Sequence, residues 1–489
     1  MDLEAAYFLI VCTLAFFGYV GFKSSSNEEV GEDAYLSARG TQSWTQIGLS
    51  LFASGMGVWV LLGPSEVAYF GGFWDVVGYA ASASAPLLLI AFVGPKIRSQ
   101  LPQGVTLADY VRDRLGRKMQ VYVGLISILY MFTFLFAEFM AIGKVMEQLT
   151  EMNPLIPMIL VGATTALYTA YGGLPASLAT DRVQGGVIVV LVSLLLIFLF
   201  AADTGKLIDD AMAYNPGGYE DTYSHGSMSY LGSFKSGLAL VVAVTAAEMF
   251  SQGNWQRAYA SEDDLALQKG AFLAAAMVFP LIFIMGVMGT VAAGQGGVGD
   301  PSVAFFHLVR DSSPLVVSAF ILLVVSLVCS STDTLQNAIV ASISRDLSGE
   351  NIGIGFSRFI TILMVPLAIF LATGPTISGF QFNSLSVFGI FLFADILAAA
   401  TVAPVMLTLW SGVSSRGALL GCFAGLFSVA IYGLIEPPTD SAFFMYLINP
   451  TLGATPASAG GLTNLWPFVA AILGSTMVTV AGSKVLPDS

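Results

Sequence analysis

Charged residues are scarce in this chain. They make up 10% of its 489 residues, whereas soluble domains carry about 25%. Hydrophobic residues make up 56%, and the mean hydropathy is +0.79. The composition therefore excludes an ordinary soluble protein and predicts an all-α membrane protein with many spans. Because the polar stretches are short, we expect one membrane domain over residues 1–489 and no separate soluble domain.

Cysteines are few, and recognisable catalytic motifs are missing. The three cysteines are scattered through apolar stretches, which disfavours a disulfide framework or a metal site and favours small buried hydrophobic residues. The sequence has no phosphate-binding loop, no metal-ligand cluster and no nucleophile–base motif. We therefore expect neither an enzyme nor a transporter driven by ATP.

Basic residues are outnumbered 32 to 19 by acidic ones. An acidic surface argues against a nucleic-acid partner. If the N-terminus lies outside the cell, 15 of the 19 basic residues fall in inner loops and four in outer loops. Because Lys and Arg are enriched in cytoplasmic loops, we expect a multi-pass protein of the cell membrane, in contact with lipid, with its N-terminus outside and its C-terminus in the cytoplasm.

A membrane-spanning helix needs about 20 apolar residues. The first such run begins with acidic residues rather than the basic stretch of a signal peptide, so we expect it to remain as the first helix. Counting the runs predicts about thirteen transmembrane helices, at 5–22, 44–69, 73–95, 119–148, 154–171, 180–202, 234–256, 270–293, 314–343, 354–373, 383–410, 417–436 and 463–483.

Two of these spans are interrupted. The span over 46–72 carries helix-breaking residues at Gly55, Gly57, Gly63 and Pro64, and the span over 238–255 contains Gln252-Gly253-Asn254. In hydrocarbon a broken helix is tolerated only where it is buried in protein or lines a cavity. Two such spans in corresponding halves indicate a secondary transporter with a site near the midplane. The halves, about 44–203 and 234–410, have five crossings each, which predicts an inverted repeat.

One apolar helix carries a group of oxygen-bearing side chains. They are Ser330, Ser331, Asp333 and Thr334. Hydroxyls and freed carbonyls of a broken helix are suitable ligands for Na⁺, although Ser and Thr also bond commonly to carbonyls of the preceding turn. Asp333 favours the functional interpretation because a carboxylate at the centre of a spanning helix costs about 2.5–3.5 kcal/mol.

Asp181 follows a Gly172-Gly173 turn, at the expected start of the sixth helix, with Thr180 as its N-cap. It fits either a cation path or an acid that the helix dipole stabilises.

Four further acids lie at membrane depth, and no basic residue is expected at comparable depth. They are Glu66, Glu138, Glu248 and Asp395. Such residues indicate cation coordination, a proton relay or a cationic or hydrogen-bond-donating substrate. The alternative is that individual acids are protonated or bonded to neighbouring polar side chains. The lack of deep Lys and Arg disfavours a simple anion as the substrate.

Amide and aromatic side chains beside the breaks are typical of a polar solute site. Together with the four acids, they give the expected substrate-binding set, which is Gly55, Trp59, Glu66, Glu138, Glu248, Ser251, Gln252, Trp255 and Asp395.

Several stretches resemble the sodium:solute symporter family, which includes sodium/proline, sodium/glucose, urea-type and pantothenate carriers. They are AYLSARG (34–40), VTLADYVRDRLG (105–116), YTAYGGLPASLATDRVQ (168–184), NWQRAYASED (254–263) and the serine pair 330–331. The resemblance runs from about Tyr7 to Trp410. It implies a LeuT-like fold with five-plus-five inverted repeats, one extra N-terminal helix and two extra C-terminal helices.

The resemblance also implies a Na⁺ site between the second and ninth helices. Its ligands would be the carbonyls of Ala53, Met56 and Leu327 and the hydroxyls of Ser330 and Ser331. Some members bind a second Na⁺, which here would involve Asp181, Ser330, Asp333 and Thr334. Sodium/proline symporters carry Asp at the position that matches Gly55, so its absence makes proline less secure as the substrate.

These observations together predict a Na⁺-driven symporter that imports a small polar solute, neutral or cationic, such as urea, a polyamine or an amino acid, by alternating access. One alternative is a proton-coupled symporter that uses the same acids. The other is a transporter-like sensor, although such proteins usually append signalling domains and this chain ends at Ser489, soon after its last helix.

Overall fold

The computed structural model describes residues 2–25, 32–201, 205–207, 209, 228–229, 231–349, 353–377, 380–381, 387–410, 412–436, 443–450 and 464–488. Within these ranges the chain is helical except for loops and one antiparallel pair of short strands, β1 (Thr376–Ile377) and β2 (Phe380–Gln381).

The helices of the bundle are α1 (Leu3–Ser25), α3 (Trp44–Gly55), α4 (Trp59–Phe70), α5 (Phe73–Gln100), α7 (Arg117–Thr150), α8 (Leu155–Ala201), α10 (Leu231–Glu248), α11 (Gln252–Ala260), α12 (Asp264–Gln295), α14 (Pro314–Ser342), α15 (Ile354–Ala372), α16 (Val387–Met406), α17 (Ser415–Ile435) and α18 (Leu465–Val485). Shorter segments are α2 (Glu32–Ser37), α6 (Leu107–Leu115), α13 (Ala304–Val309), η1 (Pro301–Val303), η2 (Ile343–Ser348), η4 (Leu407–Leu409) and η5 (Phe443–Leu447).

The spans agree with the predicted number. Eleven helices of the described chain are long and apolar enough to cross a membrane, and α3 with α4 forms a twelfth span bent by 57°. Helix α8 has 47 residues and is interrupted at Gly173, whose φ of 59° and ψ of −147° are non-helical. Glycine adopts positive φ without steric cost, and the resulting kink divides α8 into two helices. These correspond to two of the thirteen predicted spans.

The first break lies between Gly55 and Trp59, at the first two of the four predicted breaking residues, whereas Gly63 and Pro64 lie inside the continuous helix α4. The second break does not lie where the sequence predicts it. Helix α10 ends at Glu248 and α11 begins at Gln252, so the predicted breaking residues form the first turn of α11. Gly253 serves close packing instead, because a Cβ there would lie 2.6 Å from Cγ2 of Thr334 on α14.

The start of the sixth span was also predicted too late. Thr180 is inside the helix, since its hydroxyl donates to the carbonyls of Ala176 and Ser177, and it is not an N-cap. Asp181 therefore lies about two turns beyond the kink at Gly173, where a helix terminus contributes little.

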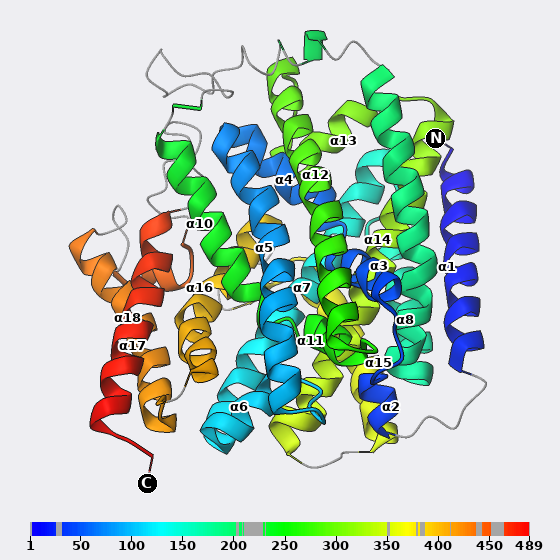
Figure 1. Ribbon diagram of the computed structural model, residues 1–489. Coiled ribbons are helices and arrows are strands. Elements are labelled where there is room, and N and C mark those ends of the chain that lie inside the picture. Colours follow the sequence, from blue (N-terminus) through cyan, green and yellow to red (C-terminus); the bar gives the residue numbers. More distant parts are fainter. Residues whose placement is uncertain are drawn as a thin grey trace.

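Figure 1 shows α1 on one flank of the bundle and α17 with α18 on the other, while the two termini lie at opposite ends. Between these flanks, α8 and α14 pack against each other, and each of them also packs against α3 and α7. The arrangement fits one additional helix before the core and two after it. Residues 202–203 and 383–386, at the edges of predicted segments, lie outside the described residues.

Candidate functional site

Glu138 of α7 occupies the break between α3 and α4. Its side chain is fully buried. Oε2 accepts hydrogen bonds from the N–H of Val58 at 2.8 Å and from Oγ of Ser331 at 3.0 Å, while Oε1 lies 3.4 Å from the N–H of Trp59. A Cβ at Gly57 would overlap this carboxylate. The glycine therefore admits the acid, and the acid satisfies the backbone that the break exposes.

Asp181 of α8 lies at the centre of a second buried cluster. Its Oδ2 accepts from Oγ of Ser50 and from Nη2 of Arg257, each at 2.6 Å, and its Oδ1 accepts from Oγ of Ser330 at 2.6 Å. Arg257 and Asp181 are both fully buried. The expectation that no basic residue reaches the depth of the acids is therefore wrong. Arg257 lies on α11, which packs inside the bundle rather than in an inner loop.

Asp333 of α14 lies beside this cluster and is held by hydroxyls of α8. Tyr168 donates to Oδ2 at 2.6 Å and Thr180 at 3.1 Å, while Ser177 donates to Oδ1 at 2.7 Å. The hydroxyl of Thr334 lies 3.4 Å from Oδ1 and accepts from Nη2 of Arg257 at 2.7 Å. Four hydroxyls from helices α8 and α14 thus lie within hydrogen-bonding distance of one buried carboxylate, and the single proton of Thr180 is shared between it and the carbonyls of Ala176 and Ser177.

The residues of the two expected Na⁺ sites lie in the same part of the bundle. Ala53 and Met56 are at the end of α3, which packs against α14, the helix that carries Leu327 and the serine pair. The four residues of the second site do meet. Ser330 contacts Asp181, and Thr334 contacts Asp333, but Arg257 lies between Asp181 and Thr334.

A small cavity opens beside the first break. Helices α4, α5, α7, α10 and α16 contribute its walls, and its nine described lining residues are Trp59, Tyr79, Tyr130, Phe134, Val244, Glu248, Phe391, Leu392 and Asp395. Five are aromatic and two are acidic. About 20 Å³ of the cavity is open to the centre of a water molecule, which is room for about one water.

The two acids of this cavity have different surroundings. Glu248 ends α10, and its carboxylate accepts from the hydroxyl of Tyr130 at 2.7 Å and from Nδ2 of Asn254 at 2.9 Å. Asp395 is 2% exposed, and its Oδ2 has no hydrogen-bond partner. Buried carboxylate oxygens are normally satisfied, so this oxygen is an open acceptor.

Two predicted solute ligands at the second break are used by the protein itself. Gln252 accepts from the N–H of Leu107 at 2.8 Å and donates to Oγ of Ser127 at 2.8 Å. Trp255 is fully buried and donates from Nε1 to the carbonyl of Met249 at 2.7 Å, which closes the break. These contacts identify both side chains as supports of the broken helix.

The remaining predicted residues lie close to the first break or to the second. Ser251 precedes α11 and is partly buried, and Glu66 is buried in α4 but does not line the cavity. Gly55 ends α3 beside open space, because a Cβ there would meet no atom within 4 Å.

Of the five aromatic residues that line the cavity, the sequence analysis singled out Trp59 but not the other four. Tyr79, Tyr130, Phe134 and Phe391 are four among 17 Tyr and 35 Phe, and aromatic residues at helical spacing are usually core. Arg257 did carry a signal, because it follows Gly253 by one turn and so shares the α11 face that approaches α14.

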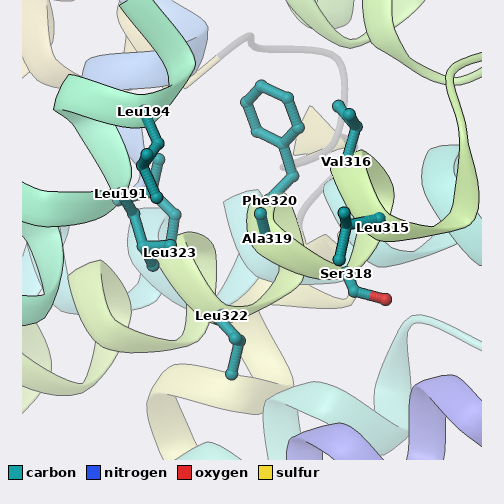
Figure 2. Close-up of a pocket in the computed structure, with 9 residues that line it drawn as sticks. All are labelled: Leu191, Leu194, Leu315, Val316, Ser318, Ala319, Phe320, Leu322 and Leu323. Carbon is teal, nitrogen blue, oxygen red and sulfur yellow. The ribbon is translucent and has the colours of Figure 1, made fainter. Parts of the chain in front are cut away.

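A larger groove lies between α8 and α14 (Figure 2). Its lining consists of leucine, valine, alanine and phenylalanine side chains and one serine. Leu194 and Leu315 are strongly exposed there. In a spanning bundle such a surface faces lipid, so this groove is a poor candidate for a polar solute site.

The sequence and the fold are similar to those of known transporters. A sequence model of the sodium:solute symporter family matches residues 35–425. The chain belongs to this family. The spermidine transporter DUR31 of Candida albicans is 30% identical over 425 residues, covering 83% of this chain and 76% of its own. The sodium/proline symporter 2 of Staphylococcus saprophyticus is 24% identical over 485 residues, covering 91% of this chain and 88% of its own.

Solved structures show the same fold. A Na⁺-coupled sialic acid symporter superposes with a TM-score of 0.70 at 14% identity, covering 98% of both chains. The transporter MhsT in complex with L-phenylalanine gives 0.56 at 15% identity, covering 91% of this chain and 99% of its own. This chain is thus a multi-pass membrane symporter of LeuT-like fold, not an enzyme.

Proposed function

We propose that this symporter is driven by Na⁺ and imports a small polar solute, neutral or cationic, by alternating access. The observation that carries sodium coupling is the placement of Ser330 and Ser331. These neighbouring hydroxyls each donate to a buried carboxylate on another helix, Asp181 on α8 and Glu138 on α7.

A hydroxyl that donates its proton to a carboxylate keeps its oxygen lone pairs for a cation, and hard cations prefer oxygen ligands. The carbonyls of Ala53, Met56 and Leu327 would complete the set around one Na⁺, which is cargo rather than a resident ion. At the second expected site the Arg257 guanidinium already bonds Asp181 and Thr334. We therefore assign one Na⁺ per cycle to the first site.

The described activities of the relatives support a small polar solute. One is described as a spermidine transporter and several as sodium/proline symporters. We place the solute in the cavity beside the first break, because aromatic walls and acidic groups meet there. Na⁺ bound between α3 and α14 would fix the break next to this cavity, and thereby link ion binding to solute binding. In this account the N-terminus lies outside and the C-terminus in the cytoplasm.

A thermal-unfolding screen of the purified protein tests sodium binding and solute identity together. Candidate solutes are compared in Na⁺ and in K⁺ at equal ionic strength, because a ligand that binds only the folded state raises its stability by RT ln(1 + [L]/Kd). We expect stabilisation that requires Na⁺ and that is lost in Ser330→Ala. Ser326→Ala is the matched control, since Ser326 lies one turn earlier and donates to the carbonyl of Leu322 on its own helix.

Equal stabilisation in Na⁺ and K⁺ at several pH values would remove sodium coupling. A proton-coupled symporter would then account better for the same buried acids, and it predicts uptake driven by a pH gradient without Na⁺.

A further inference from the structure

The N–H groups at the first break already have an anionic partner. In transporters with broken helices, the N-terminus of a half-helix points at the anionic group of the substrate, because exposed N–H groups and the helix dipole favour negative charge. Here the N–H groups of Val58 and Trp59, at the start of α4, face the carboxylate of Glu138. The protein therefore supplies the anion that a substrate carboxylate would otherwise provide.

Neighbouring residues fix the Glu138 side chain at the break. Glu138 is fully buried, Ser331 donates to it at 3.0 Å, and Gly57 leaves space for it that any larger residue would fill. A substrate carboxylate near this break would lose the N–H groups and would face the charge of Glu138. This disfavours amino acids as substrates.

The adjoining cavity has the opposite preference. Its nine described lining residues include Glu248 and Asp395 and no basic side chain. Oδ2 of Asp395 is buried and unpartnered, so a donor on the solute could bond it directly. A neutral solute such as urea could supply a donor but not the charge that two acids in a low-dielectric site require.

The walls of the cavity also suit a cation. Trp59 packs edge-on against Phe391, with ring centroids 6.2 Å apart, and Phe391 stacks on Phe134 at 4.0 Å. Tyr130 lies 4.9 Å from Phe134 and donates to Glu248. Faces of Trp, Tyr and Phe attract ammonium groups, and aromatic cages are used for such ligands.

We propose that the transported solute is a small organic amine cation without a carboxylate, specifically a diamine, held by Glu248 and Asp395 between the aromatic walls. The cavity is narrow in this conformation, so the aromatic side chains must move apart to admit it. This assignment rests on the proposed function, because it names the substrate of that symporter.

A set of four-carbon solutes isolates each feature of the assignment. The probes are 1,4-diaminobutane, butylamine, 4-aminobutanoate and 1,4-butanediol, with proline and urea beside them. Binding to the full chain is measured by thermal unfolding, and uptake of labelled probes is measured in proteoliposomes with Na⁺ or K⁺ outside. We expect 1,4-diaminobutane to bind most tightly, butylamine to bind more weakly, and 4-aminobutanoate and the diol to have no effect.

Variants locate the site. Asp395→Asn and Glu248→Gln keep the shape of the side chain. Each should weaken the binding of 1,4-diaminobutane by roughly 30-fold or more, as loss of one partner of a buried charge pair does. Asp311→Asn removes an acid whose side chain is 87% exposed and should change nothing. Two independent cavity variants keep the test valid if one of them fails to fold.

The outcomes separate this assignment from the proposed function. Na⁺-dependent uptake of 4-aminobutanoate, proline or urea without the diamine would overturn the amine site and leave sodium symport standing. Diamine uptake that is equal in Na⁺ and K⁺ would overturn sodium coupling and support the amine site. Unchanged diamine affinity in both cavity variants would overturn the location of the site.

Discussion

Gly57 permits the contact on which the first break depends, and Gly57→Ala tests it with one methyl group. The new Cβ would overlap the Glu138 carboxylate. The carboxylate must then withdraw from the N–H of Val58 and from Ser331, which now donate to it at 2.8 and 3.0 Å. Since Ser331 is also an expected Na⁺ ligand, the substitution should disturb both the break and ion binding.

The size of the effect follows from these two contacts. Hydrogen bonds to a charged group contribute about 1.5–3 kcal/mol each, so complete loss of both would cost about 3–6 kcal/mol. Partial withdrawal of the side chain retains some of this, and overpacking alone costs about 1–3 kcal/mol. We therefore expect a destabilisation of about 3 kcal/mol and a rise of at least about tenfold in the Na⁺ concentration for half-maximal uptake.

Gly186→Ala is the control, because Gly186 is an exposed residue of α8 outside both expected sites and a Cβ there meets nothing within 4 Å. Stability is measured by thermal unfolding and Na⁺ dependence by uptake in proteoliposomes. The double variant Gly57→Ala with Glu138→Asp, which shortens the acid by one methylene, should recover part of the loss. Wild-type behaviour of Gly57→Ala, or equal defects in both glycine variants, would refute the role given to Glu138.

Three further predictions concern neighbouring contacts. Arg257→Lys should lower the free energy of unfolding by about 3 kcal/mol. Complete removal of one partner of a buried ion pair costs about 3–5 kcal/mol, and lysine keeps the charge but cannot reproduce the hydrogen bonds of the guanidinium. Unchanged stability would contradict the burial of the pair. Gln252→Ala should lose about 1–3 kcal/mol without changing which solutes compete in uptake, since its amide bonds the N–H of Leu107 and Oγ of Ser127. Asp333→Asn should lower thermal stability by about 1.5–3 kcal/mol and leave the Na⁺ requirement of uptake unchanged, because hydroxyls of α8 and α14 hold this carboxylate and the Na⁺ is assigned to the first site; a raised Na⁺ requirement would contradict that assignment.

Composition and apolar runs were sufficient for the fold class, an all-α bundle of membrane spans, while the LeuT-like arrangement was implied by the family resemblance. Runs of apolar residues located the spans, and Gly55 and Gly57 located the first break, because a spanning helix loses backbone hydrogen bonds wherever it is interrupted. The second break was predicted at the wrong residues because glycine occurs both at helix breaks and at close helix contacts. Gly253 permits close helix packing, whereas the break itself lies at Met249–Ser251. This segment contains neither glycine nor proline, so the sequence does not indicate a break there.

The candidate site was only partly visible in the sequence. Acids in apolar helices are costly enough to stand out, so Glu138, Asp181 and Asp333 were found. Their partners were not, because hydrogen bonds between Asp181 and Arg257, or between Asp333 and Tyr168, join positions 76 and 165 residues apart. Long-range pairing of this kind follows from helix packing, which one sequence does not reveal.

Sodium coupling is the central claim, and uptake against a concentration gradient tests it most directly. Proteoliposomes are loaded to create an inward gradient of Na⁺, of K⁺ or of protons alone, and the labelled solute identified by the thermal-unfolding screen is added outside. The account predicts accumulation above the external concentration only with the Na⁺ gradient, and its collapse when a sodium ionophore is added. Accumulation driven by the proton gradient in the absence of Na⁺ would contradict it.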